Sequence, residues 1–250
     1  MPDMHEENTS GTKTRAEMPE YLHETRDLVL DFALPNVAFD GWSESLLREA
    51  VTQSGADPAL AKMAFPRGAL DLAAEAHRRD DLRMIESIRA TGDVLRMREK
   101  IAKAVRVRLE FAEQHEEAVR RAAALFALPQ NAAEGARLTW GTADAIWTAV
   151  GDTSTDYNWY TKRMTLSGVY SATLLYWLGD TSLDKEATWR FLDRRIEDVM
   201  RIEKVKAMAR NNPLAKLALA GPRALLSRVR APNAQKQPDG LPVGFPGRSG

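Results

Sequence analysis

Apolar residues recur at helical spacing along almost the whole of this chain, and no segment shows the alternation of apolar and polar residues that marks a half-buried strand. Trp140, Ala143, Trp147 and Val150 form one such stripe, with members three or four residues apart. A chain patterned in this way buries its apolar side chains by packing helices against one another. The sequence therefore predicts an all-α fold, a helical bundle.

Small polar residues and prolines mark where these helices begin. Ser43 is expected to cap the second helix, and Asp57 followed by Pro58 places an N-cap before a proline at the first helical position. Asn131, with Glu134 three residues later, has the spacing of a capping box at the start of the seventh helix. These signals predict short loops between consecutive helices.

Composition excludes several kinds of site. The 250 residues contain no cysteine, so there is no disulfide, no thiolate metal ligand and no cysteine nucleophile. Four scattered histidines predict no histidine metal centre. Glu20 and His23 form a single Glu-x-x-His motif, whereas a di-iron bundle needs such motifs in pairs. Because no phosphate loop, serine elbow or zinc motif is present either, we expect no catalytic residues, no metal and no cofactor.

The chain divides into five segments by composition and pattern. Residues 1–19 are expected to be a disordered leader, with neither an apolar signal core nor the Arg-rich, acid-poor composition of a transit peptide. Residues 20–80 are expected to form a three-helix, helix-turn-helix-like unit, and residues 81–208 a larger, ligand-binding helical body. Residues 209–230 are basic and amphipathic, and residues 231–250 form a Pro- and Gly-rich tail that is expected to be disordered.

The segment 209–230 has the composition of a helix that lies on a membrane surface. Between Lys204 and Lys236 the sequence has eight Lys or Arg and no Asp or Glu. Leucines alternate with these cations, so apolar burial and attraction to anionic lipid would act together. The alternative is a C-terminal helix docked on its own domain. The residues expected to touch the membrane are Leu214, Lys216, Leu217, Arg223, Leu225, Leu226 and Arg228.

Residues 24–79 resemble, in order and spacing, the helix-turn-helix unit of the TetR family, whose third helix enters the DNA major groove. Residues 21–79, however, carry six Lys or Arg against nine Asp or Glu, whereas DNA affinity comes largely from cations that displace phosphate counterions. The third helix, residues 58–64, offers one cation, Lys62, and no Asn, Gln or Arg for base edges. We therefore expect a retained scaffold without a nucleic-acid partner. The alternative is a TetR-like, ligand-responsive transcription regulator.

The stretch 151–161 combines a helix start with three large aromatics. Small polar residues precede Asp156, which is expected to cap the eighth helix. Tyr157, Trp159 and Tyr160 then point in different directions around one turn, so one buried face cannot take all three. At least one is expected to contact something outside its own core, and core burial of Trp159 and Tyr160 is the alternative.

The run GDTSTDYNWYTKR at residues 151–163, together with TWRFL at residues 188–192, closely resembles the signature of the coenzyme Q (ubiquinone) biosynthesis accessory protein family. The likeness extends from about residue 22 to residue 208. The resemblance implies a TetR-like, non-enzymatic protein that binds isoprenoid lipids or quinone intermediates at the membrane. It further implies that the protein presents these molecules to the di-iron hydroxylase that acts on demethoxyubiquinone.

The resemblance also implies site residues. Matched position by position, the surface that docks the hydroxylase is formed by Asp156, Trp159, Tyr160 and Arg163, and it continues at Ile146 on the preceding helix. Mitochondrial members carry a transit peptide, which this leader does not resemble, so we expect a cytoplasmic protein on the inner membrane or a processed eukaryotic form on the matrix side. Related regulators dimerise through their late helices, and a homodimer is therefore expected.

A lipid tunnel is expected beside the eighth helix. Gly168, Ser171 and Ala172 are small where bulk is expected, so either neighbouring helices approach closely there or the space admits an apolar ligand. For a tunnel, the expected lining residues are Leu166, Val169, Leu174, Leu175, Trp140 and Trp147, the two tryptophans being core or pocket wall.

The fifth helix carries a cationic run, which consists of Arg96, Arg98, Lys100, Lys103, Arg106 and Arg108. These positions spread around the helix, and such runs are most often solvated faces. We assign this run no function.

Overall fold

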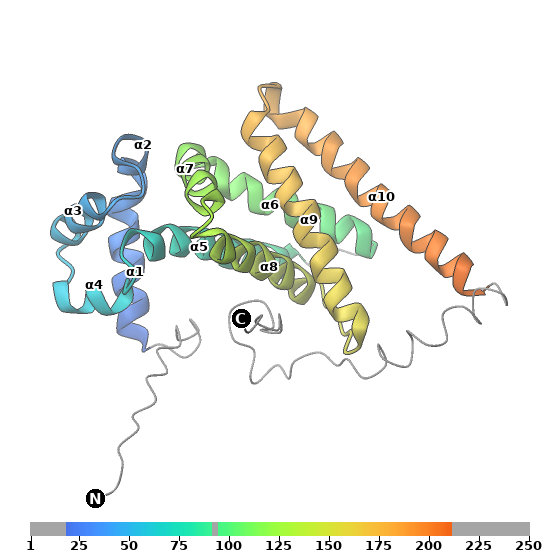
Figure 1. Ribbon diagram of the computed structural model, residues 1–250, viewed down its shortest axis with the longest axis horizontal. Coiled ribbons are helices and arrows are strands. Elements are labelled where there is room, and N and C mark those ends of the chain that lie inside the picture. Colours follow the sequence, from blue (N-terminus) through green and yellow to red (C-terminus); the bar gives the residue numbers. More distant parts are fainter. Residues whose placement is uncertain (1–18, 92–94, 212–250) are drawn as a thin grey trace, which may run out of the picture.

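The computed structural model describes residues 19–91 and 95–211, and within these ranges it contains helices and no strand (Figure 1). The all-α prediction is confirmed. The elements are α1 (Glu20–Ala33), a 3-10 turn η2 (Leu34–Asn36), α2 (Val37–Asp40), α3 (Glu44–Ser54), α4 (Pro58–Ala64), α5 (Ala69–Thr91), α6 (Met97–Glu113), α7 (Glu116–Ala127), α8 (Ala132–Ala149), α9 (Tyr157–Gly179), a second 3-10 turn η3 (Leu183–Lys185) and α10 (Glu186–Asn211).

Side-chain caps set the start of three helices. Ser43 Oγ accepts a hydrogen bond from the amide of Leu46 at the start of α3, at 3.2 Å. Asp57 accepts from two amides in the first turn of α4. Asp156 Oδ1 accepts from the amide of Asn158 at the start of α9, at 2.9 Å. All three predicted N-caps are confirmed. In each case the side-chain oxygen accepts from an amide that has no partner inside its own helix.

The predicted capping box at the start of α8 is wrong. The Asn131 side chain makes no N-cap bond, and its amide instead donates to the carbonyl oxygen of Leu125 at 3.1 Å. The Glu134 carboxylate accepts from Arg67 Nη1 at 3.0 Å and from Arg78 Nη2 at 3.3 Å. Burial by itself would raise the pKa of Glu134, but the hydrogen bond and charge of Arg67 lower it below its ordinary value. Charge pairing with distant arginines therefore replaces local capping.

The helices enclose two hydrophobic cores that share α5. Leu30, Leu46 and Leu72 belong to the core of α1–α5, to which Ala118 of α7 is added, whereas Met84 and Leu109 belong to the core of the later helices. Figure 1 shows α1 to α4 gathered at one end of the molecule, with α5 leading from them into α6 to α10. The boundary drawn between residues 80 and 81 falls inside α5, so the N-terminal unit and the body have that helix in common.

Polar contacts also fix the N-terminal unit to the body. The indole N–H of Trp42 donates to the carbonyl oxygen of Ala118 in α7 at 3.0 Å. Arg121 of α7 donates to the carbonyl oxygen of Ala38 in α2 at 2.8 Å. These hydrogen bonds to backbone carbonyl oxygens hold the N-terminal unit against α7 of the body at more than one point.

The predicted membrane contacts from Leu214 to Arg228 lie outside the described residues, as do the leader up to residue 18 and the tail 231–250. Within the described ranges, no helix combines the length and the apolar composition that crossing a bilayer requires.

Candidate partner and lipid sites

The corner between α8 and α9 is organised around Arg163, which is 3% exposed. Its guanidinium forms an ion pair with Asp144 of α8 and donates to Asp152 Oδ2 in the connecting loop at 3.2 Å. The guanidinium carbon also lies 4.0 Å from the centre of the Trp159 ring, within the range of a cation–π contact. One side chain therefore ties α8, the loop and α9 together.

Asp152 fixes the loop at this corner. Lys162 Nζ lies 2.7 Å from Asp152 Oδ1 and 2.6 Å from Ser154 Oγ. Burial would by itself raise the pKa of Asp152, but hydrogen bonds from Lys162, Ser154 and Arg163 lower it below its ordinary value. The carboxylate is therefore ionised at neutral pH and holds two cations in place.

Three of the residues predicted to dock the hydroxylase lie inside this corner. Trp159 is 7% exposed and packs against Trp140, with ring centres 6.0 Å apart. Ile146 of α8 is fully buried in the body core. Trp159 and Arg163 are four residues apart and so share the inward side of α9. The expectation that Trp159, Arg163 and Ile146 present a contact surface is therefore corrected, because their side chains support the corner from within.

The outer side of the corner is formed by other residues. Tyr160 is half-buried, with its ring edge-on to Trp159 and ring centres 4.8 Å apart. Asp156 is exposed and uses Oδ1 to cap α9. Tyr157 is 41% exposed and Met164 is 66% exposed. Tyr157, Tyr160 and Met164 lie within about one third of the helix circumference and are called the α9 outer face below. Met164 was not predicted, although its spacing of seven residues from Tyr157 places both on one side.

The residues predicted to line a lipid tunnel lie in different environments. Three of them are packed in the interior: Leu166, Val169 and Trp140. Trp147 is half-buried, with Lys162 Nζ 5.1 Å from its ring centre. Leu175 is 65% exposed, so its assignment as a lining residue is wrong: it lies on the outside of α9. A Cβ at Gly168 would meet no atom within 4 Å, so close helix packing does not require that glycine. Leu174 borders the cavity described next.

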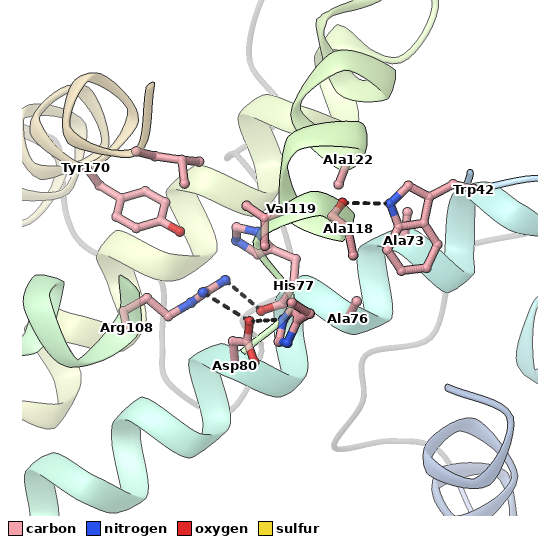
Figure 2. Close-up of a pocket in the computed structure, with 12 residues that line it drawn as sticks. Trp42, Ala73, Ala76, His77, Asp80, Arg108, Ala118, Val119, Ala122 and Tyr170 are labelled. Carbon is pink, nitrogen blue, oxygen red and sulfur yellow. Dashed lines mark hydrogen bonds and ion pairs between the residues drawn. The ribbon is translucent and has the colours of Figure 1, made fainter. Parts of the chain in front are cut away.

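A cavity of about 30 Å³ lies between α5, α6, α7 and α9, with Trp42 of the N-terminal unit at its edge (Figure 2). Much of its wall is apolar and carries mostly small side chains: Ala73, Ala76, Ala118, Val119, Ala122 and Leu174. The rest is polar: His77, Asp80, Arg108, His115 and Tyr170. This volume has room for about two or three water molecules, so in this state the cavity is too small for an isoprenoid.

Arg108 of α6 occupies the centre of the polar wall and is buried. Its Nε donates to Asp81 Oδ1 at 2.6 Å, its Nη1 to Asp80 Oδ2 at 3.3 Å, and its Nη2 to the carbonyl oxygen of His77 at 3.0 Å. Burial disfavours the charge, but interactions with Tyr170, Asp81 and Asp80 raise the pKa of Arg108 above its ordinary value. Arg108 is therefore a permanent cation paired with two buried carboxylates.

The two oxygens of Asp80 differ in their surroundings. Oδ2 accepts from Arg108 and from His115 Nε2, the latter at 2.9 Å. Oδ1 is buried without a hydrogen-bond partner, and Arg83 Nη1 at 3.9 Å is too far away to donate. Burial by itself would raise the pKa of Asp80, but His115 and Arg108 lower it below its ordinary value. Asp80 Oδ1 is therefore a buried oxygen of an ionised carboxylate that receives no hydrogen bond from the described protein groups, which is uncommon.

His77 and Tyr170 complete the polar wall as neutral groups. His77 Nε2 lies 2.8 Å from Thr142 Oγ1, and Thr142 Oγ1 donates to Asp81 Oδ1 at 3.0 Å. Burial lowers the pKa of His77 to about 4 and raises the pKa of Tyr170 to about 12. Both side chains are therefore uncharged at neutral pH.

Sequence reasoning missed this polar cluster and placed Arg108 in a solvated cationic face. That expectation is corrected, because Arg108 is buried and its aspartate partners lie 27 and 28 residues earlier in the chain. The helical period held a signal: Arg108 follows Ala104 by four residues and Val105 by three, and all three positions are buried.

Comparison with known sequences finds that the corner is similar to a known family. The sequence model of the COQ9 family matches residues 132–203, which cover α8, α9 and most of α10. The chain is 44% identical over 97 residues to the ubiquinone biosynthesis protein COQ9, mitochondrial, of Rattus norvegicus, a match that covers 39% of this chain and 31% of that protein. It is 29% identical over 217 residues to COQ9-A of Xenopus laevis, covering 83% of this chain and 68% of that protein.

The matches differ in how much of the relatives they reach. The matches to the rat protein and to the Bos taurus protein span 31% and 25% of those relatives, so less than a third of either is represented. Among solved structures, the TetR transcriptional regulator of Nitrosomonas europaea superimposes with a TM-score of 0.57 at 19% identity, covering 70% of this chain and 97% of that one. At that identity the likeness concerns the fold alone. The predicted resemblance is therefore confirmed: this chain is similar to the COQ9 proteins and has a TetR-like fold.

Proposed function

We propose that this protein is a non-enzymatic accessory factor of ubiquinone biosynthesis. In this proposal it binds isoprenoid lipids or quinone intermediates at the membrane and presents them to the di-iron hydroxylase that acts on demethoxyubiquinone. The observation that carries the proposal is the COQ9 match, because residues 132–203 contain the corner that Arg163 organises. The named relatives are mitochondrial proteins. For this chain we propose peripheral attachment to the inner membrane.

The docking part of the proposal rests on a preorganised surface. Ion pairs of Arg163 and Lys162 with Asp152 hold the first turns of α9 in one arrangement. A partner that binds there does not have to order the helix, which lowers the cost of association. The α9 outer face offers two tyrosines and Met164, residue types that are enriched at protein interfaces. We therefore place the hydroxylase contact on this face, with Asp156 at its edge.

The lipid part of the proposal depends on how polar groups of the protein position the head group of the ligand. A prenyl chain that moves from a bilayer into a dry pocket exchanges one apolar environment for another, so the transfer itself gives little affinity. Discrimination must then come from polar groups that meet the head group. In the described part of the chain, the cavity beside Arg108 brings such groups next to an apolar wall.

We also propose a homodimer formed through the late helices. From Met164 to Gly179, α9 carries no charged residue, and Leu175 projects from this stretch into solvent. Apolar surface that is left on a helix in this way is typical of subunit contacts. Sedimentation of the full chain at several concentrations measures this directly.

The docking proposal is tested with a double variant of the α9 outer face. In the full chain, Tyr160→Ala with Met164→Ala should weaken binding to the purified hydroxylase by about tenfold or more. Tyr21→Ala is the matched control, because Tyr21 is an exposed tyrosine on α1, away from the corner. Circular dichroism should show unchanged helicity. Equal affinity of the double variant and the unchanged chain would refute docking at this face.

The lipid proposal is tested on protein purified from its own host. Native mass spectrometry with lipid extraction should detect isoprenoid quinones or their precursors bound to the full chain. If the chain carries no such lipid and takes up none from quinone-loaded vesicles, the lipid part of the proposal fails.

DNA regulation is the competing function, and we propose that this chain does not perform it. In α4, Lys62 is the only basic residue, and the carboxylate of Asp57 caps the N-terminal end of that helix. Selection from random duplexes, followed by electrophoretic shifts at several salt concentrations, measures any DNA affinity. Salt-sensitive binding to one defined sequence would overturn this part of the proposal.

A further inference from the structure

Helix α7 covers the cavity beside Arg108 while burying little of its own surface. Ala118 is the only fully buried residue of the helix. Ala118, Val119 and Ala122 form its side of the cavity wall, and Figure 2 shows Val119 above the polar cluster and Ala118 beside Trp42. Because these side chains are small, α7 lies over the cavity without filling it.

The two ends of α7 are held differently. Near its start the contacts are polar: His115 with Asp80 at 2.9 Å, and Glu116 with Lys185 Nζ at 3.0 Å. The Glu116–Lys185 pair is partly exposed and can be exchanged for water at modest cost, whereas the His115–Asp80 contact is buried and costs more to break. At its other end α7 is pinned to α8, because a Cβ at Gly135 would lie 2.9 Å from the Cβ of Phe126. The helix therefore has a close-packed end, about which it can pivot, and an end that polar contacts hold.

We propose that α7 moves outward to admit a ligand, and that Asp80 Oδ1 then accepts a hydrogen bond from a hydroxyl of the ligand's head group. This inference rests on the proposed function and assigns the polar end of its lipid site. The movement is needed because the cavity, of about 30 Å³, has room for about two or three water molecules and not for an isoprenoid. Opening enlarges it between α7 and the small side chains of Ala73 and Ala76.

The chemistry of Asp80 selects the class of ligand. Its Oδ1 is buried and lacks a hydrogen-bond donor from the protein, whereas Oδ2 accepts from Arg108 of α6, a contact that a movement of α7 leaves in place. A phenol or a quinol brings an O–H donor to Oδ1. The oxidised quinone brings only carbonyl oxygens, which would face the carboxylate as acceptor against acceptor. A site built around a buried acceptor rejects a ligand that lacks the donor. The reduced ring is therefore the preferred occupant.

Cavity-filling variants test the location. The probes are decylubiquinol and decylubiquinone, titrated anaerobically into the full chain while tryptophan fluorescence is recorded. Ala122→Leu fills the cavity from α7 and should weaken decylubiquinol binding at least tenfold. Ala124→Leu is the matched control, because Ala124 is exposed on the same helix, and it should leave binding unchanged. Equal affinity of the two variants would overturn the location.

The preference for the reduced probe tests the role of Asp80. The unchanged chain should bind decylubiquinol about tenfold more tightly than decylubiquinone. Asp80→Asn should abolish this preference, because an amide can donate to a carbonyl oxygen as well as accept from a hydroxyl. Equal affinity of the unchanged chain for the two probes would overturn the assignment of Asp80.

Spin-label distances test the movement and need no change in the cavity wall. Because the chain has no cysteine, labels can be placed at Ala124→Cys on α7 and Glu86→Cys on α5, both exposed positions. Decylubiquinol should lengthen this distance, while a control pair at Glu86→Cys and Thr148→Cys on α8 should stay constant. If decylubiquinol binds and the distance between positions 124 and 86 does not change, the outward movement of α7 is refuted and the proposed function stands. If the unchanged chain binds neither probe, both this inference and the lipid part of the proposed function fail.

Discussion

Arg108 and Arg163 are two buried arginines with similar partners and different surroundings. Each forms ion pairs with two aspartates: Asp80 and Asp81 for Arg108, and Asp144 and Asp152 for Arg163. Around Arg163, both oxygens of Asp152 receive donors. Around Arg108, one oxygen of Asp80 receives none, and the cluster borders a cavity. A fully paired cluster fixes a corner of the chain, whereas an incompletely paired one leaves an acceptor for another molecule.

The largest effect is expected from removing the charge of Arg108. Arg108→Met keeps most of the side-chain volume but leaves Asp80 and Asp81 buried without their cation. Breaking a buried pair in this way costs about 3–5 kcal/mol of unfolding free energy. Urea denaturation followed by circular dichroism measures the loss. Arg106→Met, on the exposed side of the same helix, should cost less than about 1 kcal/mol. Similar losses in the two variants would show that the Arg108 cluster is solvated.

Acid should lower the unfolding free energy of the chain through His77, which lies in the polar wall of the cavity. Its pKa is lowered by burial to about 4 from an ordinary value of 6.5. Between these values the unfolded chain binds a proton that the folded chain does not, so the unfolding free energy falls as the pH drops. The loss should total about 3 kcal/mol between pH 6.5 and pH 4.

Urea denaturation at a series of pH values measures this slope, and His77→Gln should flatten it. The lowered pKa values of Asp80 and Asp152 also reduce stability in acid, but only below the ordinary aspartate value of 3.8. An unchanged slope in the His77 variant would assign the acid sensitivity to other groups.

A smaller loss is expected at Arg163. Arg163→Met should cost about 2 kcal/mol, because Asp144 is partly exposed and Lys162 still pairs with Asp152. The same variant should weaken hydroxylase binding, since the first turns of α9 lose their cross-link. Chemical denaturation and binding measured side by side test both effects. A stability loss as large as that of Arg108→Met would remove the difference between the two clusters.

The smallest effect is expected at the cap of α9. Asp156→Ala removes the acceptor for the amide of Asn158 and should cost about 1 kcal/mol. Asp156→Asn keeps a capping oxygen while removing the charge, so it should retain most of the stability. Thermal unfolding of both variants separates the two contributions. Equal destabilisation would show that the charge matters more than the cap.

The sequence predicted three helix starts because an N-cap hydrogen bond joins residues that are close together in the chain. Ser43, Asp57 and Asp156 each bond to an amide two or three residues ahead, so the sequence alone contains both partners. Glu134 follows Asn131 by three residues, but its carboxylate pairs with Arg67 and Arg78, which lie more than fifty residues earlier in the chain, and with its neighbour Arg137. Distant charges therefore decided the one cap that sequence spacing assigned wrongly.

The orientation of α9 could not be read from its pattern. Apolar and aromatic residues occur on every side of this helix, so their period does not select a buried face. Packing against α8 decides that Trp159 and Arg163 turn inward while Met164 and Leu175 turn outward. For this reason the family resemblance located the corner, but not the side chains that face solvent.

The sharing of α5 by the two cores has a thermodynamic consequence. Leu72 and Ala76 belong to one core and Met84 to the other, on a single continuous helix. Removing the first four helices would expose the beginning of α5 to water and shorten the helix on which the body is assembled. We therefore expect calorimetry to record one melting peak, because neither half is a free-standing cooperative unit. The first four helices would therefore be needed for the stability of the body even if they bind no DNA.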